Sequence, residues 1–398
     1  MTTILLSAGD LSGERHAADL VHALRERMPG TRFVGMGGGA MAASGVELRV
    51  DQQELAVGGV FEVLRSLPRV ASAWRAMRRC VSETRPDLVI LVDSGGFNLP
   101  FARWLRRHSD AKILYYVAPQ VWAWRPGRLR RLAARTDRIA VILPFEAAFY
   151  ERHGVEVDFV GHPLFDHPDP GAGPGPAVDP ASARASLGIP DHLGEGPFLG
   201  VFPGSRRNEL DRHLPLQLDA FLRLRASEPG LGSLQALVGV APNLDPDLAR
   251  DVAGRRLEAA PDAIRFVHAD DGRVLDACDV AVAKPGTITV ELMQRHKPMV
   301  VIGRVHPLSA MIARRSLRVR WLSMPNLIAG AEIVPELLQH EATPDRITAA
   351  LAPLFRSDGV ARGRQVEALS RACLALEGPG AARRTAAIAE ELLDTDPA

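Results

Sequence analysis

Short apolar runs of strand length recur along the first half of the chain, and each ends in Gly, Pro, Ser or Asp. They are TILLSAG (3–9), RFVGMGG (32–38), DLVILVDS (87–94), KILYYVAP (112–119), RIAVILP (138–144) and VDFVGHP (157–163). Segments of helix length, such as 15–28 and 99–109, lie between them. Because the runs do not alternate apolar with polar residues, they indicate strands buried on both faces. Strands separated by helices in this way predict a parallel, doubly wound α/β sheet.

The same rhythm restarts after a segment that can form neither a helix nor a central strand. Residues 168–180 contain five prolines and three glycines, which is typical of a linker. The runs that follow are PFLGVFPGS (197–205), LQALVGVAP (234–242), AIRFVHAD (263–270), CDVAVAKPG (278–286) and PMVVIGRV (298–305). We therefore predict domains at 1–167 and 197–345, a linker at 168–196 and C-terminal helices at 346–398. Two α/β halves joined in this way predict a cleft between them.

Length and composition narrow the class of protein. A chain of 398 residues is too long for one ordinary core and favours two domains. The formal net charge of +1 gives no overall field that would attract nucleic acid, so no nucleic-acid partner is expected. The three cysteines form no CxxC pair, which argues against a disulfide framework or a zinc site and suits the cytoplasm. No signal peptide or spanning helix is expected.

Two features of the first half could carry chemistry. In the loop after the first run, Gly9 and Gly13 would allow close approach of the backbone, and Ser12 could cap the next helix. Asp93 lies at the end of the run at 87–94, where a carboxylate facing a cleft is a natural general base. The alternatives are a tight βα turn for the loop, and a helix N-cap or an ordinary turn residue for Asp93, and the sequence leaves them open.

Two loops of the second half have the features of an anion site. Gly204 and Ser205 open a helix whose free N–H groups can hold an anion, and Arg206 adds a charge-assisted contact. Gly286 and Thr287 form a second helix start, with Glu291 one turn further on. A diphosphate held by these helix starts, with a carboxylate binding ribose hydroxyls, would make a nucleotide-sugar site.

A further segment combines apolar residues with arginines. Its apolar members include Val60, Phe61, Val63, Leu64 and Leu67. A helix that buries this face in the core is one interpretation. The alternative is an exposed apolar and basic face that contacts lipid at a membrane surface.

Several longer segments together resemble the lipid-A-disaccharide synthase family, a family of inverting glycosyltransferases. They are YVAPQVWAWRPGRLRRLA (116–133), LPFEAAFYERHGVEVDFVGHPLFD (143–166), GSRRNELDRHLP (204–215) and SMPNLIAGAEIVPELLQ (323–339). The similarity runs from about residue 4 to about residue 340, and PQVWAWR and PNLIAG are its most specific parts.

This resemblance implies a GT-B fold. Two Rossmann-like domains would face a central cleft, with the acceptor in the N-terminal half, UDP in the C-terminal half, and C-terminal helices returning to brace the fold. It implies that UDP-2,3-diacylglucosamine and 2,3-diacylglucosamine 1-phosphate (lipid X) form a β-1,6-linked disaccharide 1-phosphate, with release of UDP. It further implies a peripheral enzyme at the cytoplasmic face of the inner membrane, without metal or other cofactor, and able to form a homodimer.

The resemblance also assigns roles to residues. Asp93 would be the catalytic base, and Arg206 would neutralise the departing diphosphate. The other expected positions are Gly204, Ser205, Gly286, Thr287, Glu291 and Asn326 for the nucleotide, Ser12, Gly13, Asn98, Gln120 and Trp122 for the acceptor side, and Val60, Phe61, Val63, Leu64 and Leu67 for membrane or acyl chains.

The chain departs from the family pattern in three loops. In the first loop the two acids are exchanged in length, as Asp10 and Glu14; Gly96 replaces the second acid after Asp93; and Pro285 precedes Gly286 where serine is usual. Two alternatives therefore stay open. One is a GT-B relative that uses another UDP-sugar or acceptor, and the other is a catalytically silent UDP-binding protein at a membrane surface.

Overall fold

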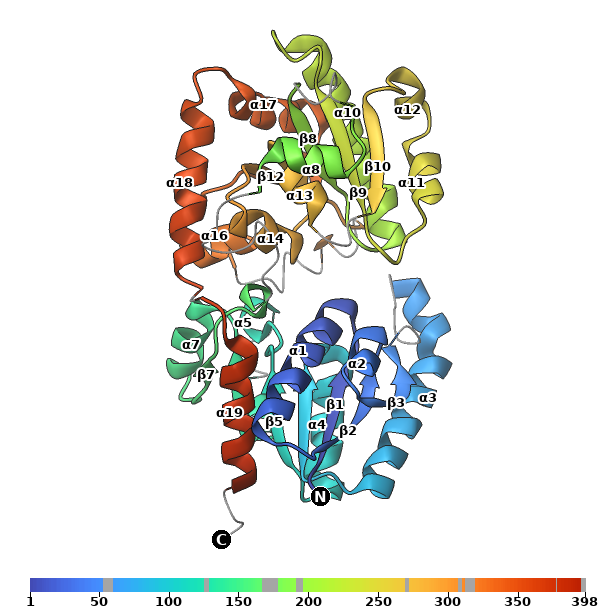
Figure 1. Ribbon diagram of the computed structural model, residues 1–398, viewed down its shortest axis with the longest axis vertical. Helices are drawn as coiled ribbons and strands as arrows, with labels where there is room; N and C mark the ends of the chain where they lie inside the picture. Colours follow the sequence, from blue (N-terminus) through green and yellow to red (C-terminus); the bar gives the residue numbers. More distant parts are fainter. Residues whose placement is uncertain are drawn as a thin grey trace. The chain divides into compact units, whose positions relative to one another are not determined.

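The chain folds into two α/β units. The computed structural model describes residues 1–52, 60–124, 129–166, 178–190, 196–268, 272–306, 310–311, 319–376 and 378–394. One unit consists chiefly of Met1–His167 and Leu376–Ala398, and the other of Pro168–Arg315 and Val319–Ala375. Each has a parallel sheet with helices packed against it (Figure 1). The prediction of two doubly wound α/β halves is confirmed.

The first unit is built on a seven-stranded sheet in the order β3-β2-β1-β4-β5-β6-β7. Its central strands β1, β4 and β5 are buried along their whole length, apart from the half-buried first residue of β5, which explains why they read as continuous apolar runs. The strands are β1 (Thr3–Ala8), β2 (Arg32–Gly37), β3 (Glu47–Asp51), β4 (Leu88–Val92), β5 (Lys112–Tyr116), β6 (Arg138–Val141) and β7 (Asp158–Phe159). The helices are α1 (Leu11–Arg27), α2 (Gly39–Ala43), α3 (Val60–Thr84), α4 (Gly95–His108), α5 (Val121–Trp124), α6 (Leu129–Ala133), α7 (Pro144–Glu151), the 3₁₀ turn η3 (Pro163–Phe165) and α19 (Ala381–Asp394).

The last helix of the chain returns to the first unit, as the resemblance implies. Helix α19, drawn in red in Figure 1, packs against α1, β4 and β5. The Asp166 carboxylate caps its N-terminus by accepting hydrogen bonds from the backbone N–H groups of Gly380, Ala381 (2.9 Å) and Ala382 (2.7 Å). Arg384 Nε donates to the Val160 carbonyl at 2.8 Å. The final helix is therefore an integral layer of the first unit.

The second unit is built on a six-stranded sheet in the order β10-β9-β8-β11-β12-β13. Its strands are β8 (Phe198–Phe202), β9 (Gln235–Val240), β10 (Ile264–His268), β11 (Val280–Ala283), β12 (Met299–Gly303) and β13 (Glu336–Leu338). Its helices are α8 (Pro180–Ser186), α10 (Arg207–Ser227), α11 (Pro246–Ala253), α12 (Arg255–Ala259), α13 (Arg273–Ala277), α14 (Ile288–Gln294), α16 (Met324–Ala329), the 3₁₀ turn η4 (Gln339–Glu341), α17 (Pro344–Phe355) and α18 (Val360–Leu374).

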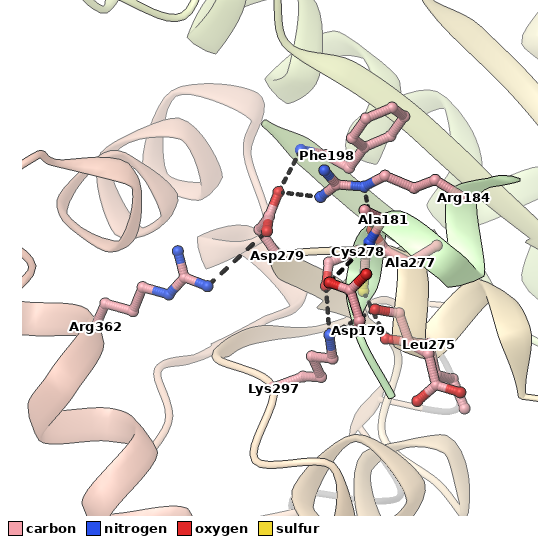
Figure 2. A network of polar contacts seen from close by, with 11 residues as sticks. Asp179, Ala181, Arg184, Phe198, Leu275, Ala277, Cys278, Asp279, Lys297 and Arg362 are labelled. Atoms are coloured by element: carbon pink, nitrogen blue, oxygen red, sulfur yellow. Dashed lines mark hydrogen bonds and ion pairs between the residues drawn. The ribbon is translucent and has the colours of Figure 1, made fainter. Parts of the chain in front are cut away.

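Part of the segment expected to be linker, 168–196, is an ordered helix of the second unit. Helix α8 is fixed by Arg184, whose Nη2 lies 2.8 Å from Asp279 Oδ2 (Figure 2). The same carboxylate oxygen accepts the Phe198 N–H at 2.8 Å, and the guanidinium lies 4.3 Å from the centre of the Phe198 ring. These contacts attach α8 to the amino-terminal ends of β8 and β11.

Two edge strands carry no apolar run in the sequence. Strand β3 has one buried residue among its five, and β13 is three residues long and only half-buried. The side chains of these two strands lie partly in solvent, so the pattern of a buried strand is lost, whereas the partly buried edge strands β7 and β10 keep an apolar run.

Candidate functional site

The first sheet has a topological switch point between β1 and β4, which is the place where its strand order changes direction. Ligands of open α/β sheets bind at such a point, beyond the carboxyl ends of the strands. The loops after β1 and β4 meet through Ser94, whose Oγ donates to Asp10 Oδ2 at 2.9 Å and accepts the Gly9 N–H at 3.0 Å. Asp93 and Asp10 flank Gly13, where an added Cβ would lie 3.1 Å from Asp10 Oδ1 and 3.7 Å from Asp93 Cβ. Two carboxyl groups and two glycines therefore share this switch point.

The backbone at Asp93 is strained. Asp93 and Ser94 have φ values of 44° and 45°, in the left-handed region that residues other than glycine rarely adopt. The Asp93 carbonyl accepts hydrogen bonds from Tyr115 Oη at 2.7 Å and Asn98 Nδ2 at 3.0 Å. Asn98 Oδ1 in turn accepts from Ser7 Oγ at 2.7 Å. Strain held in this way by surrounding bonds is typical of functional sites.

The structure assigns the N-cap of α4 to Ser94, so the Asp93 carboxyl group does not serve as the cap. Burial and, to a smaller extent, the negative charges of Asp10 and Glu146 together raise the pKa of Asp93 to about 7, against the lowering effect of its hydrogen bond with the Ser94 backbone. A carboxyl group with a pKa near neutrality is suited to take up and release a proton. The N-cap alternative is therefore wrong, Asp93 lies in the turn between β4 and α4, and its role as general base stays a prediction.

Asn98, expected on the acceptor side, has no exposed surface. Its Nδ2 also donates to the carbonyls of Ser7 at 3.1 Å and Val92 at 3.0 Å. The amide is thus used to hold the turn that carries Asp93, and Asn98 acts on the site through that turn.

The first loop places its two acids differently from expectation. Helix α1 is capped by Asp10, whose Oδ1 accepts the Gly13 N–H at 2.7 Å, so the expected capping by Ser12 is wrong. Ser12 lies half-buried in the first turn of α1. Glu14 is buried and accepts from the Ala40 N–H at 2.7 Å and from Gln52 Nε2. The exchanged acids are therefore both held by local hydrogen bonds.

Trp122 is a buried anchor with 6% of its surface exposed. Its Nε1 donates to Glu146 Oε1 at 2.8 Å, and Glu146 Oε2 accepts the N–H groups of Ile142 and Leu143 at 3.2 and 3.1 Å. Burial raises the pKa of Glu146 to about 7, although these three donors oppose the rise. Gln120 is exposed. The buried Glu146 was missed from the sequence, although it is the acid of the LPFE segment.

The segment between β5 and Trp122 lies against the Asp93 turn. Val117 has a φ of 56°, a conformation that a β-branched residue seldom adopts. Asp93 N–H donates to the Tyr116 carbonyl at 3.1 Å. An added Cβ on Gly95 would lie 2.9 Å from Pro119 Cβ, so only glycine fits there. The strained turns after β4 and β5 are therefore direct neighbours.

The second sheet has its own switch point, between β8 and β11. The loop after β8 contains Gly204, with a φ of 121°, Ser205 and the 58%-exposed side chain of Arg206. The loop after β11 begins with Lys284, whose Nζ donates to Glu209 Oε1 at 2.9 Å. The sequence identified the first three residues but not Lys284 and Glu209, which could have been suspected from the charges next to the two predicted strand ends.

Hydrogen bonds with the side chains of His213 and Asn243 fix the loop after β8. His213 is buried; its Nδ1 lies 2.9 Å from the Pro203 carbonyl, and its Nε2 lies 3.0 Å from the backbone nitrogen of Arg304. Asn243 Nδ2 donates to the Ser205 carbonyl at 2.9 Å. Burial lowers the pKa of His213, so the ring is neutral, and Nδ1 donates while Nε2 accepts.

The remaining predicted nucleotide residues divide into two groups. Gly286, Thr287 and Glu291 lie half-buried at the start of α14, with Gly286 at a φ of 151°. Asn326 is fully buried, and its Oδ1 accepts the N–H groups of Ile333 at 2.7 Å and Val334 at 2.9 Å. Its Nδ2 donates to the Val334 carbonyl and to Glu336. Both ends of the Asn326 amide are therefore used in hydrogen bonds to the segment 333–336.

The side chains expected to contact membrane or acyl chains cannot be assigned to either switch point. The side chains of Val60, Phe61, Val63, Leu64 and Leu67 lie outside the described residues, as do Arg125 and Arg128. A cavity of about 1630 Å³ opens at the opposite edge of the first sheet, lined in part by Thr2, Thr31, Asp87 and Lys112, and none of the predicted site residues lines it.

No helix in the described part of the chain has the length and apolar character needed to cross a membrane. The described side chains also contain no group of three His, Cys, Asp or Glu residues placed to bind a metal ion.

Solved structures with the same architecture include a Staphylococcus aureus MnaA structure with UDP (TM-score 0.67, 13% identity, 100% of this chain and 99% of that one). Another is sucrose-phosphate synthase from Thermosynechococcus elongatus (TM-score 0.59, 16% identity, 100% of both chains). A third is Anabaena HepE in complex with UDP and glucose (TM-score 0.57, 15% identity, 98% and 99%). The fold that these comparisons define is the GT-B fold.

The family model for lipid-A-disaccharide synthetase matches residues 4–392. The lipid-A-disaccharide synthase of Anaeromyxobacter dehalogenans (strain 2CP-C) is 39% identical over 395 residues, covering 98% of this chain and 96% of that protein. That of Myxococcus xanthus (strain DK1622) is 38% identical over 391 residues, covering 98% and 97%. The chain belongs to the lipid-A-disaccharide synthetase family.

Proposed function

We propose that the protein joins UDP-2,3-diacylglucosamine to 2,3-diacylglucosamine 1-phosphate, with inversion at the anomeric carbon. The products are a β-1,6-linked disaccharide 1-phosphate and UDP. The observation that carries this proposal is the pair of switch points, one with a carboxyl group of pKa about 7 at Asp93 and the other with cationic groups at Arg206 and Lys284. Family membership supplies the substrates.

In the proposed reaction Asp93 removes the proton from the acceptor 6-hydroxyl as its oxygen attacks the anomeric carbon. A new C–O bond forms there, and the bond from that carbon to the diphosphate breaks, with its electron pair passing to the diphosphate oxygen. Arg206, Lys284 and the Ser205 N–H then face the negative charge that develops on UDP. Attack from the side opposite the leaving group converts the α-linked donor into a β-linked product.

The other predicted residues have supporting roles in this proposal. Gly204, Gly286 and Thr287 bring backbone close to the diphosphate, and Glu291 binds ribose hydroxyls. Gly13, Ser12, Gln120 and Trp122 shape the acceptor side, in which Trp122 acts from its buried position. Asn98 positions the turn that carries Asp93, and Asn326 fixes the segment from Ile333 to Glu336.

We also propose that the protein works at the cytoplasmic face of the inner membrane, because both substrates carry acyl chains. The exposed arginines Arg69, Arg75, Arg78 and Arg79 on α3 would suit anionic head groups. Neither metal nor nucleic acid has a part in the proposal. A homodimer is proposed from the family alone, and light scattering of the purified protein tests it.

The test is incubation of purified protein with both substrates in detergent, followed by mass spectrometry. The expected result is a disaccharide 1-phosphate together with UDP. A different disaccharide, formed only when another UDP-sugar or acceptor is supplied, would assign the chain to a GT-B relative with other substrates. Binding of UDP without any transfer would contradict an enzymatic role.

A further inference from the structure

One carboxylate gathers the anion-binding groups of the second switch point. Glu209 Oε2 accepts the Ser205 N–H at 3.0 Å, and Glu209 Oε1 accepts from Lys284 Nζ at 2.9 Å. Arg206 Nη1 lies 3.9 Å from the same Oε1. These donors come from the loops after both β8 and β11. Two cationic side chains and a backbone N–H around one carboxylate form the arrangement that otherwise receives a bound anion.

The loop is shaped around this side chain. An added Cβ on Gly204 would lie 2.4 Å from Glu209 Oε2 and 2.8 Å from Glu209 Cβ, so no residue larger than glycine fits while Glu209 is in place. Burial alone would raise the pKa of Glu209, but Lys284, Arg206 and the Ser205 N–H hold the pKa below its usual range. The Glu209 side chain is therefore negatively charged and fills the space beside Gly204 in this loop.

A purely structural ion pair in the same unit has a different environment. Arg295 and Asp276 meet at 2.9 Å with side chains that are 2% and 7% exposed. The side chains of Glu209 and Lys284 are 16% and 23% exposed and lie at the carboxyl edge of the sheet, where a ligand can reach them. Access to solvent and the participation of a helix-start N–H set the Glu209 pair apart.

We infer that Glu209 is a resident anion, which binds the diphosphate-binding donors in the empty site and releases them when the diphosphate of the nucleotide arrives. This inference rests on the proposed donor function of the second unit. Because diphosphate and Glu209 compete for Ser205 N–H and Lys284, the carboxylate weakens binding of the nucleotide and promotes release of UDP after transfer. No bond is made or broken in the exchange.

The test compares the binding of UDP, pyrophosphate and uridine by calorimetry in wild type and Glu209→Gln. Removing one negative charge close to the diphosphate should tighten UDP and pyrophosphate by roughly five- to tenfold. Uridine has no phosphate, so its affinity should not change. Glu258→Gln removes an exposed charge on α12 of the same unit and should bind like wild type.

Weaker or unchanged binding of UDP by Glu209→Gln would overturn the inference. If that variant fails to fold, Glu209→Ala provides the second test, because it removes both the charge and the contacts with Lys284 and the Ser205 N–H, and it should likewise tighten UDP. Lys284→Met should weaken UDP and pyrophosphate but not uridine, and equal affinities would also count against the inference. Wild type that binds neither UDP nor pyrophosphate would refute the donor site itself, whereas wild type that binds both, with no gain in the variants, would refute the resident anion alone.

Discussion

The two sheets have the same strand order around their switch points and opposite charge in the loops that follow. In the first unit the loops after β1 and β4 bring together Asp10 and Asp93. In the second the loops after β8 and β11 bring together Arg206 and Lys284, with Glu209 between them. Topology therefore determines where a ligand can bind, and the loop residues determine its chemistry.

The two points also differ in how the backbone turns. The second uses glycines, with φ values of 121° at Gly204 and 151° at Gly286, and the first places Asp93 and Ser94 in the left-handed region. A site that binds an anion through backbone N–H groups needs no side chain at the turn. A site that presents a carboxyl group does need one, and the cost of strain is then offset by hydrogen bonds to the Asp93 carbonyl.

Replacing the proposed base should have the largest effect, because it should stop turnover through the first unit and leave the binding of UDP by the second unit intact. Asp93→Asn keeps the shape but removes the proton acceptor, so kcat should fall by roughly 10²–10⁴-fold. The affinity for UDP should not change, because the nucleotide is assigned to the other unit. Calorimetry and a mass-spectrometric rate assay measure the two effects, and Asp110→Asn, an exposed acid in the same unit, is the control. Turnover that survives in Asp93→Asn would remove Asp93 as the base.

Releasing the strained turn should have the next largest effect. Asn98→Ala removes the amide that holds the Asp93 carbonyl and leaves buried carbonyls without a partner, at a cost of about 2–4 kcal/mol in the free energy of unfolding. We expect kcat to fall by roughly tenfold or more, with the Kd for UDP unchanged. Tyr115→Phe removes only the second bond to that carbonyl and should give a smaller fall. A parallel loss of UDP affinity would show general unfolding instead of a local effect.

Disturbing the buried anchor should have a moderate effect on the first unit. Glu146→Gln leaves an NH₂ group facing either the Trp122 N–H or two backbone N–H groups, so the free energy of unfolding should fall by about 2 kcal/mol. Denaturant titration measures it, and the KM for the acceptor should rise more than that for the UDP-sugar. Glu151→Gln, at the exposed end of α7, is the matched control. Equal rises in both KM values would argue against an acceptor-side role.

The smallest expected effect is a shift along the pH axis. Asp93 must be ionised to act as a base, so kcat should rise with pH through about 7, the pKa of its buried carboxyl group. Asp10→Asn removes a neighbouring negative charge and lowers the pKa of Asp93, which moves this rise to lower pH by about one unit. The pH profile of kcat tests it. A profile that does not move would show that the charge of Asp10 does not raise the pKa of Asp93.

More of the fold than of the candidate site could be predicted from the sequence. Eleven apolar runs predicted strands, and nine of these strands are buried almost throughout, where a strand covered on both faces has few alternatives to apolar residues. The other two, β7 and β10, are partly buried edge strands that still carry an apolar run. The edge strands β3 and β13 were missed because they are partly in solvent and carry no such run. Helix α8 was not predicted, because the prolines and glycines before it obscured the helix start at Asp179 and Pro180.

Within the site, positions at strand ends could be predicted and roles often could not. Asp93 and Arg206 lie in the loops after β4 and β8, as the strand signals before them predicted, and their catalytic roles stay predictions. Asn98, Trp122 and Asn326 were identified as site residues, but the structure shows them buried and engaged in hydrogen bonds to the protein. Contacts of this kind join residues from different elements, such as Ser7 and Asn98, and no local pattern records them.

The return of α19 to the first unit has a consequence for how the protein is made. A ribosome releases the first unit's sheet early, but the helix that covers α1, β4 and β5 emerges only after the whole second unit has been made. The first unit is therefore completed later than the second, and until then the Asp166 carboxylate lacks the backbone N–H groups that it will cap. During translation the first unit has an uncovered side, which is closed only when α19 emerges.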